Sequence, residues 1–128
     1  MSIKNNKYQE RGDAGEALFQ QEVEKRFGVT AQPTPHTHPY DFNIDDTRVE
    51  VKYSTYGPNG YQANLRGHDA KDFDILVLIL WAGISLSYLI IPADKVTQTK
   101  ITIRNKEGRG KFSAYKNNWN LLAQAIGA

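Results

Sequence analysis

Apolar and polar residues alternate with a period of two from Pro39 to Lys52, in the stretch PYDFNIDDTRVEVK. In its first half, Phe42 and Ile44 are separated by polar residues, and the second half alternates in the same way through Val49 and Val51. This period is typical of half-buried strands, each with one apolar and one charged face. The two halves therefore predict a β-hairpin.

The turn of this hairpin fixes its register. Residues 45–46 are both Asp, which tolerates left-handed backbone angles, so they predict a two-residue loop. The loop sets Phe42 opposite Val49 and Asp41 opposite Glu50. A register slipped by one residue would instead set Phe42 against Glu50 and bury charge against the core. The predicted pairing places two carboxylates side by side.

Two carboxylates in contact require a compensating charge. Like charges directly across a strand pair are destabilising, and the pKa of at least one acid rises unless a cation is present. Oxygen ligands from Asp41 and Glu50 suit Mg²⁺ better than zinc, which prefers nitrogen and sulfur. Lys52 follows on the same face as Glu50, where its charge could position a water or steady a phosphate oxygen.

The first helix is predicted to carry a third acid on its apolar face. Phe19 and Val23 lie at four-residue spacing, and Glu16 precedes Phe19 by three residues. One interpretation is a first-turn acid favoured by the helix dipole. Beside the hairpin, a third metal-directed carboxylate is the better account. The neighbours of Glu16 are small and would allow close approach to a sheet or a nucleic acid; they are Gly12, Ala14, Gly15 and Ala17.

The remaining patterns predict an α/β fold with a central mixed β-sheet, flanked by an N-terminal and a C-terminal helix. The predicted elements are a helix over 8–27 stopped by Gly28, an extended connection over 29–39, strands over 61–65, 74–81, 84–91 and 100–104, a basic turn over 105–111, and a helix over 114–126. Only about eight residues separate the strand at 61–65 from the next, too few for the usual parallel crossover. Either a one-turn helix connects them or the strand order differs.

Three segments together resemble the PD-(D/E)XK nuclease superfamily. Asp41 followed by Glu50-Val51-Lys52 resembles its signature, with Pro39-Tyr40-Asp41 standing where the Pro-Asp usually stands. Gly12-Asp13-Ala14-Gly15-Glu16 resembles the first-helix pattern of archaeal-type Holliday junction resolvases and group I intron-type homing endonucleases. The strand ending Tyr88–Pro92 resembles the intron-type enzymes more.

The resemblance implies a restriction-endonuclease-like core and a metal-dependent DNA endonuclease. Mg²⁺, for which Mn²⁺ can substitute, would be held by Glu16, Asp41, Glu50 and the Val51 carbonyl. Lys52 would complete the catalytic set Asp41, Glu50, Lys52 and Glu16. One site per chain implies a homodimer or higher homo-oligomer wherever both DNA strands are cut.

The substrate stays open at this point. Site-specific homing or restriction-type cleavage and Holliday-junction or other structure-specific cleavage both fit the resemblance. A non-catalytic DNA-binding subunit of a restriction, repair or defence complex is the alternative. The clustered acids count against it, because a protein that only binds phosphate gains little from acids that repel phosphate.

Composition places these segments in one domain over residues 1–128. The chain has 40% apolar and 23% charged residues and no cysteine, so a disulfide framework and a Cys-based zinc site are excluded. No apolar run is long enough to cross a bilayer, and residues 1–6 lack the apolar segment of a signal peptide. We therefore expect a soluble, cytoplasmic protein with no membrane partner.

Charge is unevenly distributed along the chain. Residues 1–94 carry 9 Lys/Arg against 13 Asp/Glu, whereas residues 95–128 carry 7 against 1. A basic segment attached to an acidic site suits a phosphate-backbone ligand such as DNA, although solubilising lysines give the same pattern. The candidate DNA-binding residues are Arg11, Gln62, Arg66, Lys106, Arg109 and Lys111. His36 and His38 have no third ligand at a suitable spacing, so a plain loop is favoured over a transition-metal site.

Overall fold

The protein is an α/β molecule, described by a computed structural model over residues 3–35, 37–65 and 72–128, with side chains from residue 13 onward. Its elements are α1 (Ile3–Phe27), β1 (Gln32–Pro33), β2 (Phe42–Ile44), β3 (Thr47–Thr55), β4 (Tyr61–Asn64), β5 (Ile75–Ala82), β6 (Ser85–Pro92), the 3₁₀ turn η1 (Ala93–Lys95), β7 (Lys100–Ile103), the 3₁₀ turn η2 (Ser113–Tyr115) and α2 (Trp119–Ile126). The predicted central mixed sheet between an N-terminal and a C-terminal helix is confirmed. In the ranges that the structure describes, no helix combines the length and the apolar character needed to cross a membrane.

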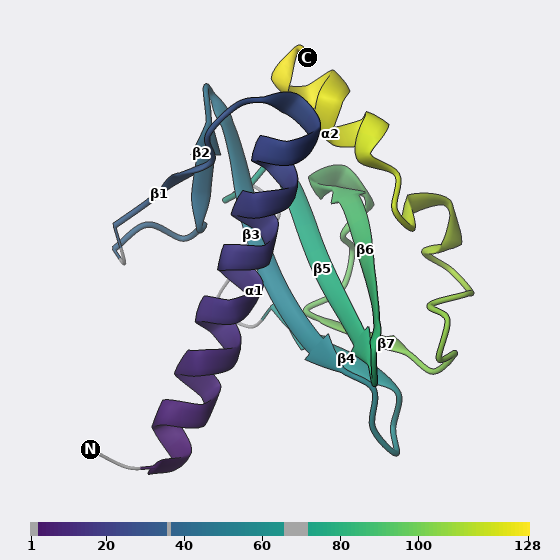
Figure 1. Cartoon of the computed structure of the whole chain (residues 1–128). Coiled ribbons are helices and arrows are strands. Elements are labelled where there is room, and N and C mark those ends of the chain that lie inside the picture. The colour runs from purple at the N-terminus through teal and green to yellow at the C-terminus, as the bar shows by residue number, and fades with distance from the viewer. Residues whose placement is uncertain (1–2, 36, 66–71) are drawn as a thin grey trace.

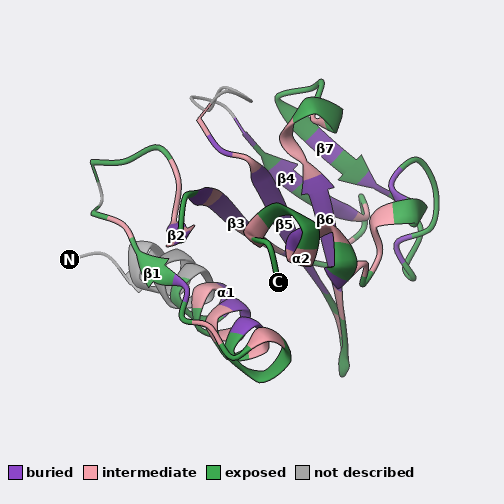
Figure 2. Cartoon of the chain, turned by 90° about the horizontal axis from the view of Figure 1, so that it is seen from above, coloured by how far each residue is buried: buried purple, intermediate pink, exposed green. Residues whose placement is uncertain are grey.

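Two sheets form the centre of the molecule. The larger has the order β1-β2-β3-β5-β6, in which β3 and β5 run parallel and the other pairs antiparallel. The smaller sheet is the antiparallel pair β4-β7. Helix α1 lies across one face of the larger sheet, and β4 and β7 lie on the opposite side (Figures 1 and 2).

Each face of the larger sheet has its own hydrophobic core. On the helix side, Phe19 and Val23 of α1 and Leu122 of α2 pack with strand residues such as Val77. On the other side, the inward residues of β4 and β7 pack with alternate residues of β5 and β6. Residues 75–80 of β5 are all buried, which explains why this strand is a continuous apolar run in the sequence.

The hairpin has the register predicted from its alternation. Phe42 pairs with Val49, and Ile44 pairs with Thr47. Asp45 adopts a left-handed conformation with φ of 51°, as the two-residue loop requires. The period-two pattern was therefore sufficient to align these strands.

Gly15 brings α1 close to β3, whereas Ala14 and Ala17 are exposed. A Cβ atom added at Gly15 would lie 3.1 Å from the Cβ of Tyr53, so a side chain here would push helix and strand apart. One turn later Phe19 is completely buried. Gly28 ends the helix with a φ of 65°, and its N–H donates to the Glu24 carbonyl at 2.9 Å. The predicted close approach and helix stop are both confirmed.

Three predicted elements differ in the structure. Helix α1 begins at Ile3, five residues earlier than predicted. The strand predicted over 61–65 lies outside the central sheet and pairs with β7, so the chain crosses from β3 to the parallel β5 by way of the second sheet. The closing helix begins at Trp119, five residues later than predicted. Asn117 prevents an earlier start because it has a φ of 51° and its N–H donates to the Tyr88 carbonyl at 2.5 Å.

An ion pair ties the beginnings of the parallel strands β3 and β5. The Asp74 carboxylate accepts from the Arg48 main-chain N–H at 2.8 Å and from its guanidinium at 3.1 Å. In return, the Asp74 N–H donates to the Arg48 carbonyl at 2.9 Å. The hydrogen bond from the Arg48 side chain lowers the pKa of the Asp74 carboxyl below its usual 3.8.

We predict that Asp74→Asn lowers the free energy of unfolding at pH 7 by about 1 kcal/mol, a modest value because the pair is partly exposed. A lowered pKa stabilises the fold above the unfolded-state pKa, and this contribution disappears as the pH falls through the folded-state pKa. Urea unfolding of both proteins from pH 7 to pH 2 should therefore show the difference shrinking below about pH 4. Asp13→Asn, on an exposed part of α1, is the control. Equal stability of Asp74→Asn and wild type at pH 7 would contradict the prediction.

Candidate functional site

The candidate site lies where strands β2 and β3 diverge at Asp41. Phe42 is the residue of β2 next to Asp41, and it pairs with Val49. The Asp41 N–H also donates to the Val49 carbonyl, at 2.9 Å. Its side chain then takes the place of a strand partner, because Oδ2 accepts from the Val51 N–H at 2.8 Å. This bond holds the Asp41 carboxylate against β3 next to Glu50.

Glu50 is a buried acid in direct contact with Asp41. The residue is only 3% exposed and pairs with Leu76 in the centre of the sheet. Burial raises the pKa of Glu50 to about 9, and a hydrogen bond with Asp41 and the negative charge of Asp41 act in the same direction. The positive charge of Lys52 opposes this rise. The two carboxylates predicted to lie side by side therefore do so.

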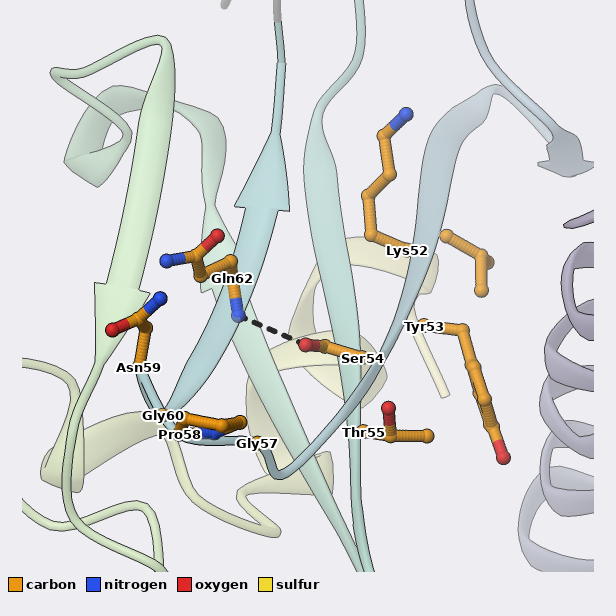
Figure 3. A pocket seen from close by; sticks show the side chains of 10 residues that line it. Lys52, Tyr53, Ser54, Thr55, Gly57, Pro58, Asn59, Gly60 and Gln62 are labelled. Atoms are coloured by element: carbon orange, nitrogen blue, oxygen red, sulfur yellow. Dashed lines mark hydrogen bonds between the residues drawn. The ribbon is translucent and has the colours of Figure 1, made fainter.

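Lys52 lines an open cavity and is close enough to Glu50 for its positive charge to act on that acid. The cavity has a volume of about 490 Å³ and lies between the end of β3 and the start of β4. Lys52 and Gln62 both line it, from two different sheets (Figure 3). The Gln62 N–H donates to Ser54 Oγ at 2.9 Å, which joins the sheets at this point. The cavity thus has an ammonium group and an amide in its wall, and Val51, the neighbour of Glu50 in sequence, also lines it.

Glu16 reaches the site from the helix. It lines a second cavity, of about 250 Å³, together with His38 and Asp41. Within the described part of the chain, the structure shows no cluster of three or more Asp, Glu or His side chains close enough to hold a metal ion. The predicted acids are therefore arranged as an Asp41–Glu50 pair in contact, with Glu16 sharing a cavity with Asp41.

Four of the six candidate DNA-binding residues have described side chains, and these lie in two places. Gln62 lines the main cavity, whereas Lys106, Arg109 and Lys111 are exposed on the loop between β7 and η2. In this loop, Asn105 Oδ1 accepts from the N–H groups of residues 107 and 109 at 3.0 and 3.1 Å, which fixes its backbone. Three predicted residues lie outside what the structure describes: the side chain of Arg11, Arg66 and His36.

Ser54 is a residue of the site that was not predicted from the sequence. Its side chain is 7% exposed, and its hydroxyl oxygen is the acceptor that connects β3 to β4. A signal was present, because Glu50, Lys52 and Ser54 continue the period of two and place three polar residues on one face of β3. A polar residue at a buried strand position needs a hydrogen-bond partner, and here that partner comes from another sheet.

Comparison with known proteins gives a structural relative. No known family and no curated protein matches the chain by sequence. The structure is similar to that of a bacterial homing endonuclease, I-Ssp6803I, with a TM-score of 0.72 and 17% identity over 93% of this chain and 95% of that one. The two chains thus share their fold over nearly their whole lengths, and the endonuclease-like architecture implied by the sequence is confirmed.

Proposed function

We propose that this chain is a divalent-metal-dependent endonuclease that hydrolyses phosphodiester bonds in DNA. The observation that carries the proposal is the buried contact between Asp41 and Glu50, with Lys52 beside it at an open cavity. Two carboxylates in contact disfavour folding unless their charge is compensated. A functional site accounts for keeping them, and the fold shared with a homing endonuclease agrees with this function.

The donor set fits Mg²⁺. Asp41 and Glu50 supply hard oxygen atoms, and Val51 supplies its carbonyl. In a strand the N–H and C=O of one residue project to the same edge, so this carbonyl lies on the edge where the Val51 N–H meets Asp41. Glu16 would act through a water across the cavity it shares with Asp41. Bound there, Mg²⁺ or Mn²⁺ would offset negative charge on the phosphate.

The chain's own residues would then orient the reactants. The Lys52 ammonium donates to a phosphate oxygen or to the attacking water, and stabilises the charge that develops on the phosphate. The water oxygen would form a bond to phosphorus while the bond to the leaving sugar oxygen breaks; the attacking water loses a proton to solvent, and the leaving oxygen takes one up from solvent. No covalent bond to the protein is needed, which agrees with a site built from acids and a lysine.

We predict that Glu50→Ala and Lys52→Ala each reduce cleavage of supercoiled plasmid by about 100-fold or more, because each removes a charge that the transition state needs. Cleavage should require Mg²⁺ or Mn²⁺ and stop with chelator. Matched controls are Glu24→Ala and Lys25→Ala on the exposed face of α1, which should cut like wild type. If wild type binds DNA with Mg²⁺ and with Mn²⁺ but never cuts it, the result would instead support the alternative that the chain is a non-catalytic DNA-binding subunit.

A four-way junction and a plain duplex of the same arm sequences separate the two substrate classes. Site-specific cleavage predicts cutting of any duplex that contains the preferred sequence. A structure-specific enzyme predicts cutting at the junction while the plain duplex stays intact. Gel analysis of the products with Mg²⁺ distinguishes these results.

We also predict that Glu50→Gln stabilises the metal-free protein above pH 5. A raised carboxyl pKa means that the folded state keeps its proton while the unfolded chain loses it, so stability falls as the pH rises from 4.5 to about 9. Glutamine mimics the protonated acid and removes this fall. Thermal unfolding in chelator should therefore show a growing advantage of Glu50→Gln from pH 5 to pH 9, at most about 1.4 kcal/mol per pH unit.

Added Mg²⁺ should reverse this order. It should raise the melting temperature of wild type at pH 8 and have a smaller effect on Glu50→Gln, because the variant has lost one anionic ligand. Glu24→Gln is the matched control and should respond like wild type. If neither Mg²⁺ nor Mn²⁺ changes the melting temperature of wild type, no metal binds at this site, whatever the cleavage assays show.

The proposed partner besides DNA is a second copy of this chain. One chain carries one acid pair, so cutting both strands of a duplex in one binding event needs two sites related by symmetry. We predict a homodimer or larger homo-oligomer in sedimentation equilibrium under the conditions that give double-strand breaks. A monomer under those conditions would contradict this part of the proposal.

A further inference from the structure

The two-stranded sheet β4-β7 has two chemically different faces. Its inward residues are apolar and buried against the larger sheet: Tyr61, Ala63, Ile101 and Ile103. Its outward residues are exposed and polar: Gln62, Asn64, Lys100 and Thr102, followed by Arg104 at the end of β7. This alternation is visible in the burial colours of β4 and β7 (Figure 2).

The outward residues form two cross-strand pairs. Gln62 pairs with Thr102, and Asn64 pairs with Lys100. We name the face formed by Gln62, Asn64, Lys100, Thr102 and Arg104 the ribbon face. It offers two amides, a hydroxyl and two cations, and none of its five residues is acidic. These are the side chains that hydrogen-bond to base edges and phosphates in duplex DNA.

We propose that the ribbon face enters the major groove and reads base sequence. The proposal rests on the DNA endonuclease function and deepens it, because it assigns sequence-specific duplex DNA as the substrate and locates the specificity. Amides of Gln and Asn pair with adenine through its N6 and N7, and Arg pairs with guanine through O6 and N7. Gln62 and Asn64 therefore select adenine, and Arg104 selects guanine.

The ribbon face is continuous with the hydrolytic site. Gln62 lines the same cavity as Lys52, so the ribbon begins at the wall of that cavity (Figure 3). The Ser54 hydroxyl, two residues beyond Lys52 on β3, accepts the Gln62 N–H at 2.9 Å. A duplex with a phosphate at Lys52 therefore passes beside the ribbon, where its bases are within reach.

Dimensions of the ribbon match those of the groove. Neighbouring strands lie about 4.8 Å apart, so a two-stranded ribbon with its side chains enters a major groove about 12 Å wide. Gln62 and Asn64 are two residues apart on one strand, which separates them by about 6.8 Å. Two base-pair steps of about 3.4 Å span the same distance. The two amides are thus spaced to contact bases two steps apart.

Contacts at the end of the ribbon hold it in place. The Tyr61 hydroxyl donates to the Lys106 carbonyl at 2.5 Å, and the Tyr56 hydroxyl donates to the Arg104 carbonyl at 3.3 Å. At Gly60, an added Cβ would lie 2.3 Å from the Ile103 carbonyl oxygen, so the strands meet at a spacing that only glycine permits. A reading surface must be rigid to discriminate between bases, and these contacts meet that requirement.

The test is selection from a randomised duplex DNA library, with two separate readouts. Retention on a filter in Ca²⁺ reports binding, and release of cut products in Mg²⁺ reports hydrolysis. Wild type is compared with Gln62→Ala, Asn64→Ala and Arg104→Ala. Gln124→Ala and Asn120→Ala are matched controls, because these exposed amides lie on α2, against the other face of the larger sheet.

We expect wild type to enrich a consensus with adenine and guanine preferences, and each ribbon variant to lose its preference at one position. The loss at that position should be about 5- to 150-fold, while the other positions stay as in wild type. The control variants should enrich the wild-type consensus. Lys111→Ala, on the loop between β7 and η2, should weaken binding to all sequences alike. It should also reduce the slope of log affinity against log salt concentration by about one.

Three results would overturn the assignment: a wild-type selection without base preference, no retention of duplex DNA, or ribbon variants with the wild-type consensus. The last of these would mean that the outward residues are an ordinary solvated face. Failure of the endonuclease function is a different result, in which the Ca²⁺ selection yields a consensus but no Mg²⁺ product appears.

Discussion

The contact between Asp41 and Glu50 is the constraint on which the site depends. Burying two acids together costs free energy, as the rise of the Glu50 pKa to about 9 reflects. The surrounding structure supplies the stability that permits it. Six successive residues of β5 are buried, and the Arg48–Asp74 pair fixes the start of β3 against this strand. A rigid apolar centre thus holds an electrostatically unfavourable pair at its edge.

Divergence of the hairpin leaves Asp41 at the wall of the smaller cavity, next to the buried Glu50. If β2 continued to pair with β3 beyond Phe42, a backbone strand would cover the edge at Val51. Instead the Asp41 side chain takes the Val51 N–H, so a carboxylate occupies the position of a strand partner. The same bond that completes the hydrogen bonding of β3 therefore orients a candidate ligand. One hydrogen bond, from the Val51 N–H to the Asp41 carboxylate, thus serves both the sheet and the candidate site.

Sequence patterns predicted the local features and missed those set by distant contacts. Alternation through Phe42 and Val49 was enough for the hairpin, because a register error of one residue reverses every side chain. The partner of β4 was not predictable, since four alternating residues fit any strand with an apolar face. The delayed start of α2 depends on the contact of Asn117 with Tyr88, which no local pattern encodes.

The same reasoning explains which parts of the site were found from sequence. Asp41, Glu50 and Lys52 belong to one hairpin, and their arrangement follows from strand geometry alone. The roles of Ser54 and Gln62 depend on how the two sheets meet. Their hydrogen bond joins the strand that carries the acids to the ribbon face. The face of β3 that carries Glu50, Lys52 and Ser54 is thus the face that meets the second sheet, and no pattern within the hairpin alone encodes that meeting.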